Sequence, residues 1–181
     1  GTARLKIVAA PGLVRLLAVR IGGDVGQRHI AGSRHRSHRL LSSVRPTRFQ
    51  ETEWHVPRER GLACLRAVVD RLEQHNEAFF PLEFRFVQGD GAWLSPFHGR
   101  DSCSIAVHAA ADEAWDYLID DFTPIFRAHQ GRPHWGKLHR LGAVDLAPLY
   151  PRWADFAAVR QRFDPQGRLL NAHLRQVFGI T

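Results

Sequence analysis

The sequence predicts an α+β domain in which helices cover an antiparallel sheet. Residues 79–87 alternate, with aromatic and aliphatic side chains on one face of a strand and Glu83 and Arg85 on the other. Residues 58–75 instead repeat apolar side chains at the three- and four-residue spacing of a helix that buries one side. The order strand, helix, strand, loop, strand, helix matches half of a split β-α-β unit and predicts this fold class.

The first half of the chain contributes most of the predicted sheet. Residues 47–56 alternate imperfectly, with Glu51, Glu53 and His55 on one side, and a proline brackets this strand at each end. The second of these prolines also suits the start of the helix that follows. In chain order we expect a strand over 47–56, a helix over 58–75, a strand over 79–87, a loop over 88–101 and a strand over 102–109.

The second half is predicted to be mostly helical. Apolar residues recur at helical spacing over 111–129, where Pro124 should kink or end the helix. A further helix is expected over about 152–163. After a proline- and glycine-containing turn, Asn171 can cap a last short helix that ends near Phe178.

Charge is concentrated in the first 50 residues, which carry ten of the 25 Lys and Arg side chains and one of the 18 acidic ones. We expect residues 1–36 to be a poorly organised basic arm and residues 37–181 to be the folded domain. Basic residues cluster from Arg34 to Arg48, and one hypothesis is that the chain binds nucleic acid through them. No aromatic residue lies among these bases to stack on a single strand, so a solvated arm is the expectation.

Cysteine usage and hydropathy exclude other classes of protein. Cys64 and Cys103 lack the spacing of metal ligands, and no run of eighteen apolar residues occurs. We expect no bound metal and no nucleic acid. The expected location is cytoplasmic, with membrane association left open.

A turn over residues 131–137, Gly-Arg-Pro-His-Trp-Gly-Lys, contains one of the two lysines of the chain. A lysine kept among so many arginines suggests a compact point charge at Lys137, although composition alone favours a solvated lysine in a tight turn. Gly131, Gly136 and Lys137 also fit the first part of a phosphate-binding loop. Leu138 stands where Ser or Thr should hold magnesium, which excludes that site.

Several motifs resemble one known family. They are Pro133-His134-Trp135-Gly136-Lys137, Leu149-Tyr150-Pro151-Arg152-Trp153, Phe163-Asp164-Pro165-Gln166-Gly167, Phe80-Pro81-Leu82-Glu83-Phe84-Arg85 and Trp93-Leu94-Ser95-Pro96-Phe97-His98-Gly99-Arg100-Asp101. Residues 37–181 thereby resemble the C-terminal part of the flavin-dependent sugar-lactone and alditol oxidases, of the vanillyl-alcohol-oxidase class. The resemblance implies the cap domain of such a flavoprotein without its FAD-binding domain.

The resemblance also implies the chemistry and its residues. The implied cofactor is FAD, the substrate is a sugar lactone or polyol, and a CH–OH group loses a hydride to the flavin. Glu83, Arg85 and Lys137 are the implied catalytic residues, while Glu83, Arg85 and His108 would bind substrate. Lys137 and His134 would contact the cofactor, with Trp135 supporting the turn.

These residues should converge on one open face of the domain. The competing hypothesis is a catalytically inactive fragment that acts as a binding or assembly module.

Overall fold

The computed structural model describes residues 4–7, 19–20, 48–75 and 82–180. Its centre is a sheet in which every neighbouring pair of strands is antiparallel, in the order β2-β1-β4-β5-β3-β6. The strands are β1 (Arg4–Ile7), β2 (Val19–Arg20), β3 (Phe49–Pro57), β4 (Leu82–Val87), β5 (Ser102–Ala110) and β6 (Arg132–Pro133). The predicted α+β class with an antiparallel sheet is therefore confirmed.

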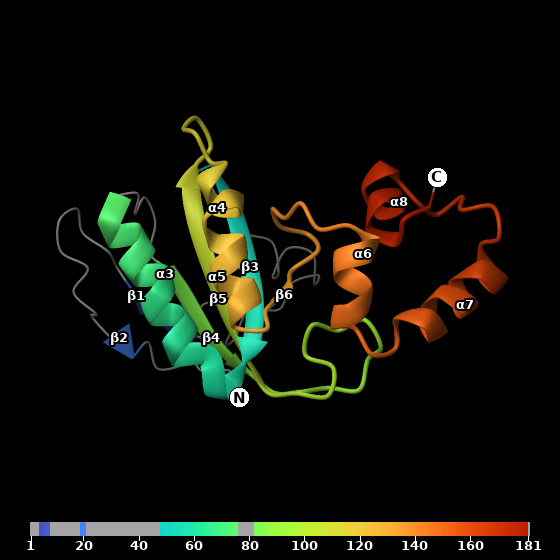
Figure 1. Cartoon of the computed structure of the whole chain (residues 1–181), viewed down its shortest axis with the longest axis horizontal. Coiled ribbons are helices and arrows are strands. Elements are labelled where there is room, and N and C mark those ends of the chain that lie inside the picture. The colour runs from blue at the N-terminus through green and yellow to red at the C-terminus, as the bar shows by residue number, and fades with distance from the viewer. Residues whose placement is uncertain (1–3, 8–18, 21–47, 76–81, 181) are drawn as a thin grey trace, which may run out of the picture.

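One face of the sheet carries the hydrophobic core. Trp54 of β3, Phe84 of β4 and Ile105 of β5 point to this face and are at most 1% exposed. The helices α3 (Gly61–His75) and α5 (Phe122–Ala128) pack over it, and the Trp54 ring stacks on Phe126 of α5 with centroids 5.5 Å apart (Figure 1). Each large side chain buried here contributes about 1.5–3 kcal/mol.

Helix α3 forms because its apolar residues follow helical spacing. Leu65, Val68 and Leu72 are buried against the sheet, while most of the charged residues of α3 face solvent. The predicted helix over 58–75 is present, but its first turn is the 3₁₀ helix η1 (Arg58–Arg60). The α-helix then begins at Gly61, where a side-chain Cβ would lie 2.3 Å from the Cys103 sulfur.

The helix expected over 111–129 is shorter and broken. The structure has α4 (Tyr117–Asp120) and α5, separated at Asp121, and residues 111–116 are not helical. Pro124 does not end a helix, because it lies in the first turn of α5. The N–H that proline lacks is not needed for an intrahelical bond at that position.

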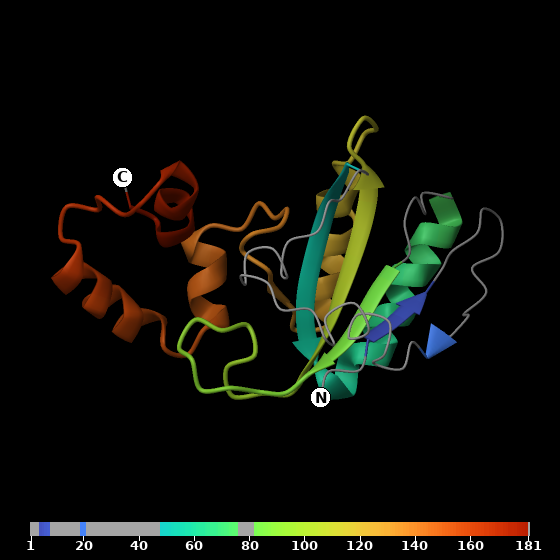
Figure 2. The same ribbon diagram turned by 180° about the vertical axis from the view of Figure 1, so that it is seen from behind.

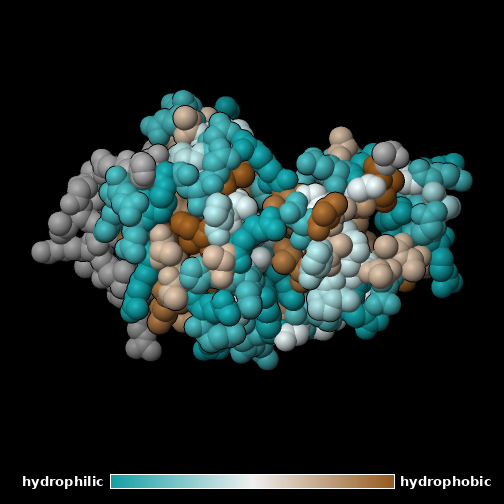
Figure 3. All heavy atoms as spheres, viewed as in Figure 1, coloured by the Kyte–Doolittle hydropathy of each residue, from teal (hydrophilic) through white to brown (hydrophobic). Residues whose placement is uncertain are grey.

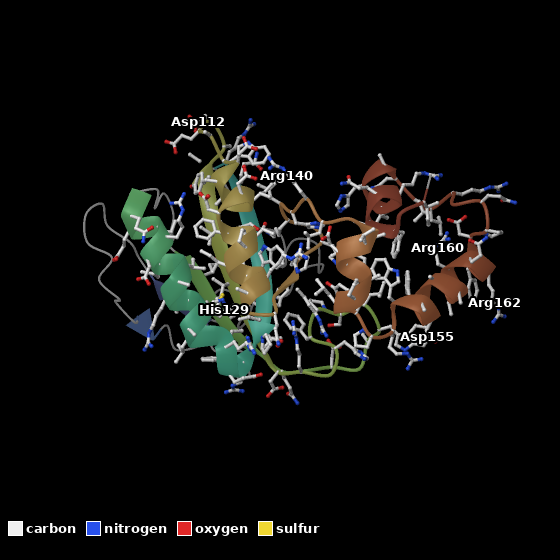
Figure 4. All side chains as sticks on the ribbon, in the orientation of Figure 1. Asp112, His129, Arg140, Asp155, Arg160 and Arg162 are labelled. Atoms are coloured by element: carbon white, nitrogen blue, oxygen red, sulfur yellow. The ribbon has the colours of Figure 1, made fainter. Side chains whose placement is uncertain are left out.

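The C-terminal part lies beside the sheet (Figure 1). It contains α6 (Ala143–Leu146), the 3₁₀ helix η2 (Ala147–Leu149), α7 (Trp153–Phe163) and α8 (Ala172–Phe178). The predicted Asn171 cap is confirmed, since its Oδ1 accepts a hydrogen bond from the Leu174 N–H at 2.8 Å. The charged residues of α7 labelled in Figure 4 lie at the end of the molecule far from the sheet.

The described surface differs between the two sides of the sheet. On the helix side, hydrophilic residues cover most of the surface, with small hydrophobic patches between them (Figure 3). On the other side the strands themselves are in view, and no helix of the described ranges covers them (Figure 2). Within those ranges, no helix is both long and apolar enough to cross a membrane.

Two short strands come from the segment expected to be a basic arm. Strand β1 pairs with β4, and β2 pairs with β1 at the edge of the sheet. The rest of residues 1–36, and the basic cluster up to position 47, lie outside the described residues, as do residues 76–81 at the start of the strand predicted over 79–87. The domain boundary at residue 36 stays a prediction.

Candidate functional site

The side of the sheet opposite the core carries polar side chains in three rows, which we call the polar face. Because side chains alternate along a strand, residues two apart share a face. The strand register places Arg85 of β4, Ser104 of β5 and His55 of β3 in the first row. The second row is Glu83, Ala106 and Glu53, and the third contains His108 and Glu51.

The turn that contains Lys137 is fastened to the edge of β3. The His134 N–H donates to the Glu53 carbonyl and the Leu138 N–H to the Glu51 carbonyl, both at 2.9 Å. The turn starts at Gly131 because a Cβ there would lie 2.8 Å from the Phe126 carbonyl oxygen. These contacts bring Lys137 onto the polar face from a segment remote in the sequence.

Glu51 joins two of the predicted site residues. Its carboxylate forms an ion pair with the Lys137 ammonium, and its other oxygen lies 3.6 Å from His108 Nε2. Burial by itself raises the pKa of Glu51. The hydrogen bonds from His108 and Lys137, with the charge of both, outweigh it and lower the pKa from 4.5 to about 2. Glu51 is therefore an anion at any ordinary pH.

Glu53 is an ion-pair partner of Arg85, as Glu51 is of Lys137. The two side chains form an ion pair across the central strand, above Ala106, and the Glu53 side chain is only 7% exposed. Glu83 lies on the other side of Arg85, with 4.0 Å between the carboxylate and guanidinium. Glu83 and Arg85, which the sequence places on one face, are thus close together, but Glu53 is the nearer partner of Arg85.

A cavity of about 560 Å³ opens on the first row of the polar face. This volume is in the range of small-molecule sites. Its floor includes Arg85, Ser104, His55 and Glu53, and its walls come from the 88–101 loop and the 131–137 turn. Arg132 holds these walls together, because its guanidinium donates to the Pro96 and His98 carbonyls at 3.1 and 3.0 Å.

His55 is a buried, neutral imidazole in the floor of this cavity. It is 2% exposed, and its Nδ1 lies 2.7 Å from the Ser104 hydroxyl. Burial, followed by the charges of His134, Arg85 and Arg100, lowers the pKa of His55 to about 3. The imidazole therefore offers a hydrogen bond without carrying a charge.

A second hollow, of about 470 Å³, adjoins the first beside Lys137. Trp135 and Gly136 line both, so only this turn separates them. The Trp135 indole N–H donates to the Tyr150 hydroxyl at 3.0 Å, which fixes the ring between the two hollows. Glu51 and Lys137 belong to the second hollow, whereas Glu53 and Arg85 belong to the first.

The structure brings the sequence-predicted site residues to one face. Glu83, Arg85 and His108 lie on adjacent strands of the polar face, and Lys137 reaches it through Glu51. His134 lines the cavity, and its Nδ1 accepts from the Gly136 N–H at 3.1 Å. Their roles toward substrate and cofactor stay predictions.

Sequence reasoning missed Glu51, Glu53 and His55, although their alternation on one side of β3 was visible. Two acids and a histidine at alternate positions of one predicted strand are the signal that could have found them. In the described part of the chain no three His, Cys, Asp or Glu side chains form a group able to hold a metal ion.

Comparisons with known proteins identify the family to which the chain is similar. Residues 11–177 match the family model described as D-arabinono-1,4-lactone oxidase. The chain is 39% identical over 145 residues to the L-gulono-1,4-lactone dehydrogenase of Mycobacterium tuberculosis, covering 80% of this chain and 34% of that protein.

Two further relatives extend the comparison. The L-gulonolactone oxidase of Mus musculus is 32% identical, with 78% of this chain and 34% of that protein covered. The alditol oxidase of a Streptomyces species is 34% identical, with 70% and 31% covered. The chain thus spans about a third of the length of these relatives. On the match over residues 11–177, the chain belongs to the D-arabinono-1,4-lactone oxidase family.

Proposed function

We propose that the chain is the substrate-binding part of an FAD-dependent oxidoreductase that acts on a CH–OH group of a sugar lactone or alditol. The observation that carries this proposal is the polar face, where Glu53 and Glu83 pair with Arg85, and Glu51 pairs with Lys137, beside two adjoining cavities. Membership of a family of sugar-lactone oxidoreductases supplies the reaction class.

Each charged residue has a role that follows from its environment. Arg85 supplies positive charge beside the reacting oxygen in the first cavity, and Lys137 supplies it in the adjoining hollow. The carboxylates of Glu53 and Glu51 hold them in place. Glu83 is further exposed than Glu53, at 25% against 7%, and accepts the hydroxyl proton of the substrate. A bound flavin would supply the hydride acceptor.

The residues of the cavity suit a flavin and its substrate. Phe97, Leu94 and Trp135 give it an apolar wall against which a planar ring can pack. Arg85 has its Nε buried without a hydrogen-bond partner among the described residues, so an acceptor oxygen of a ligand would satisfy it. We propose that a flavin-binding domain, on the same or a separate polypeptide, meets the polar face.

Calorimetric titration of the purified chain with L-gulono-1,4-lactone and with xylitol tests the substrate site. We expect saturable binding that Glu83→Gln weakens about 10- to 100-fold, because one charge-assisted hydrogen bond contributes roughly 1.5–3 kcal/mol. Arg162→Gln, on the distant helix α7, is the matched control and should leave the affinity unchanged. Equal affinities for the unmodified chain and Glu83→Gln would contradict the proposed site.

The cofactor is tested separately by adding FAD and following its fluorescence. We expect quenching that saturates and that Lys137→Ala weakens, with circular dichroism showing that the variant is folded. Binding of lactone without any response to FAD, even with a donor flavin domain supplied, would instead support an inactive binding module.

A further inference from the structure

The pair formed by His55 and Ser104 is a buried polar feature that the proposed reaction does not use. Both residues are 2% exposed, and both line the 560 Å³ cavity. The Nδ1 of His55 is occupied by Ser104, but its Nε2 is buried without a hydrogen-bond partner among the described residues. Buried polar atoms are nearly always hydrogen-bonded, so the unpaired Nε2 leaves one hydrogen bond for a water or a ligand group to make.

The chemistry of this imidazole favours a hydroxyl as the ligand group. If the Ser104 hydroxyl donates to Nδ1, the Nε2 of His55 carries a proton and donates; in the other tautomer Nε2 accepts. An alcohol hydroxyl matches either tautomer, because it both donates and accepts. A carboxylate or phosphate matches only one, and the buried Glu53 in the same floor would repel it.

The cavity walls favour a carbon chain that carries such hydroxyls. Phe97 contacts the His55 ring edge to face, with centroids 4.7 Å apart, and Leu94, Pro96 and Trp135 add further apolar surface. The polar floor and apolar walls together suit a polyol or the side chain of a sugar lactone. Its hydroxyls would face the sheet while its C–H groups pack on the walls.

The position of the pair in the sheet defines which hydroxyl it can reach. Neighbouring strands of a sheet lie about 5 Å apart. His55 and Arg85 share the first row on either side of β5, so their backbones are about 10 Å apart. Both residues line the cavity, so a pentitol or hexitol held at its reacting end by Arg85 can reach His55, whereas glycerol cannot.

We propose that His55 and Ser104 form a subsite for the hydroxyl group remote from the reacting carbon, and that this subsite sets the preferred chain length of the substrate. The inference rests on the proposed function, since it assumes that a sugar lactone or alditol binds to the polar face.

Calorimetry with glycerol, erythritol, xylitol and sorbitol tests the subsite. In the unmodified chain we expect xylitol to bind at least tenfold more tightly than glycerol. His55→Phe should remove most of this ratio while leaving the glycerol affinity unchanged, and His55→Gln, which keeps a hydrogen-bonding group, should restore part of it. A ratio unchanged in His55→Phe would overturn the subsite.

A second measurement uses the unmodified chain, in case the variants do not fold. The ¹⁵N resonances of the His55 ring report the hydrogen bonding of each nitrogen, so we expect Nε2 to shift when xylitol is added and to stay in place with glycerol. No shift at a saturating xylitol concentration would overturn the inference. The Glu83→Gln titration separates the two proposals, because its failure counts against the proposed function whatever His55 does.

Discussion

Replacing Glu51 by glutamine is the most direct test of how the polar face is held together. The carboxylate is shared by Lys137 and His108, and its side chain is 11% exposed. Its pKa, lowered from 4.5 to about 2, corresponds to about 3 kcal/mol of folding stability at pH 7. We expect Glu51→Gln to lower the free energy of unfolding by about that amount at pH 7.

The sign of the pH dependence follows from the direction of the shift. The unfolded state binds the proton more readily than the folded state, so the contribution of Glu51 is fully present above its unfolded pKa of 4.5. It declines as the pH falls toward about 2, the pKa in the folded protein. At pH 3 about 1 kcal/mol of it should remain.

Urea unfolding at pH 7 and pH 3, followed by tryptophan fluorescence, measures this difference. The gap between the unmodified chain and Glu51→Gln should shrink by about 2 kcal/mol between the two pH values. Glu73→Gln, at an exposed position on α3, is the matched control and should show no such change. A gap that is the same at both pH values would refute the assignment of the low pKa to the contacts of Glu51.

Three further predictions concern stability and protonation. Since burial lowers the pKa of His55 to about 3, its ring proton resonances should show the neutral form from pH 8 to pH 4 in an NMR titration. Tyr150→Phe removes the acceptor of the Trp135 indole N–H and should lower the free energy of urea unfolding by about 1–3 kcal/mol. Asn171→Ala removes the cap on the Leu174 N–H and should cost about 1 kcal/mol in the same assay.

Each of these predictions has an outcome that would contradict it. For His55, titration of a free histidine peptide gives the reference midpoint, and a midpoint above pH 5 in the folded chain would contradict its buried, neutral state. For Tyr150, a variant as stable as the unmodified chain would show that the hydrogen bond to Trp135 contributes nothing. For Asn171, the Asn171→Ser variant should keep the cap, so equal losses for Ser and Ala would exclude capping as the cause.

The strands of the sheet could be predicted because their signals are local. Alternation and bracketing prolines located β3 within two residues of its bounds, and the α3 periodicity located its helix. The helix predicted over 111–129 was too long because Trp115 packs against the core from a segment that is not helical, and because Pro124 is compatible with a first helical turn. Local sequence patterns do not distinguish a non-helical segment that packs an apolar residue from a helix, or a proline that ends a helix from one that lies in its first turn.

The candidate site was only half predictable for a different reason. Glu83, Arg85 and Lys137 were found through motifs, but their partners Glu51 and Glu53 depend on which strands become neighbours. The separation between Glu51 and Lys137 is 86 residues, and nothing in either segment specifies the other. A cavity assembled from the 88–101 loop and the 131–137 turn is likewise a product of tertiary packing.

The smallest side chains of the polar face have a consequence for how this domain could change. Ser104 and Ala106 lie on β5, which is hydrogen-bonded on both sides, so their backbone is fixed. Of the two, only Ser104 lines the cavity, whereas Ala106 lies beneath the ion pair of Glu53 and Arg85. The depth of the cavity is therefore adjustable at Ser104, one small group at a time. Such a change alters the size of the cavity and the hydrogen bond to His55, while every charged group stays in place.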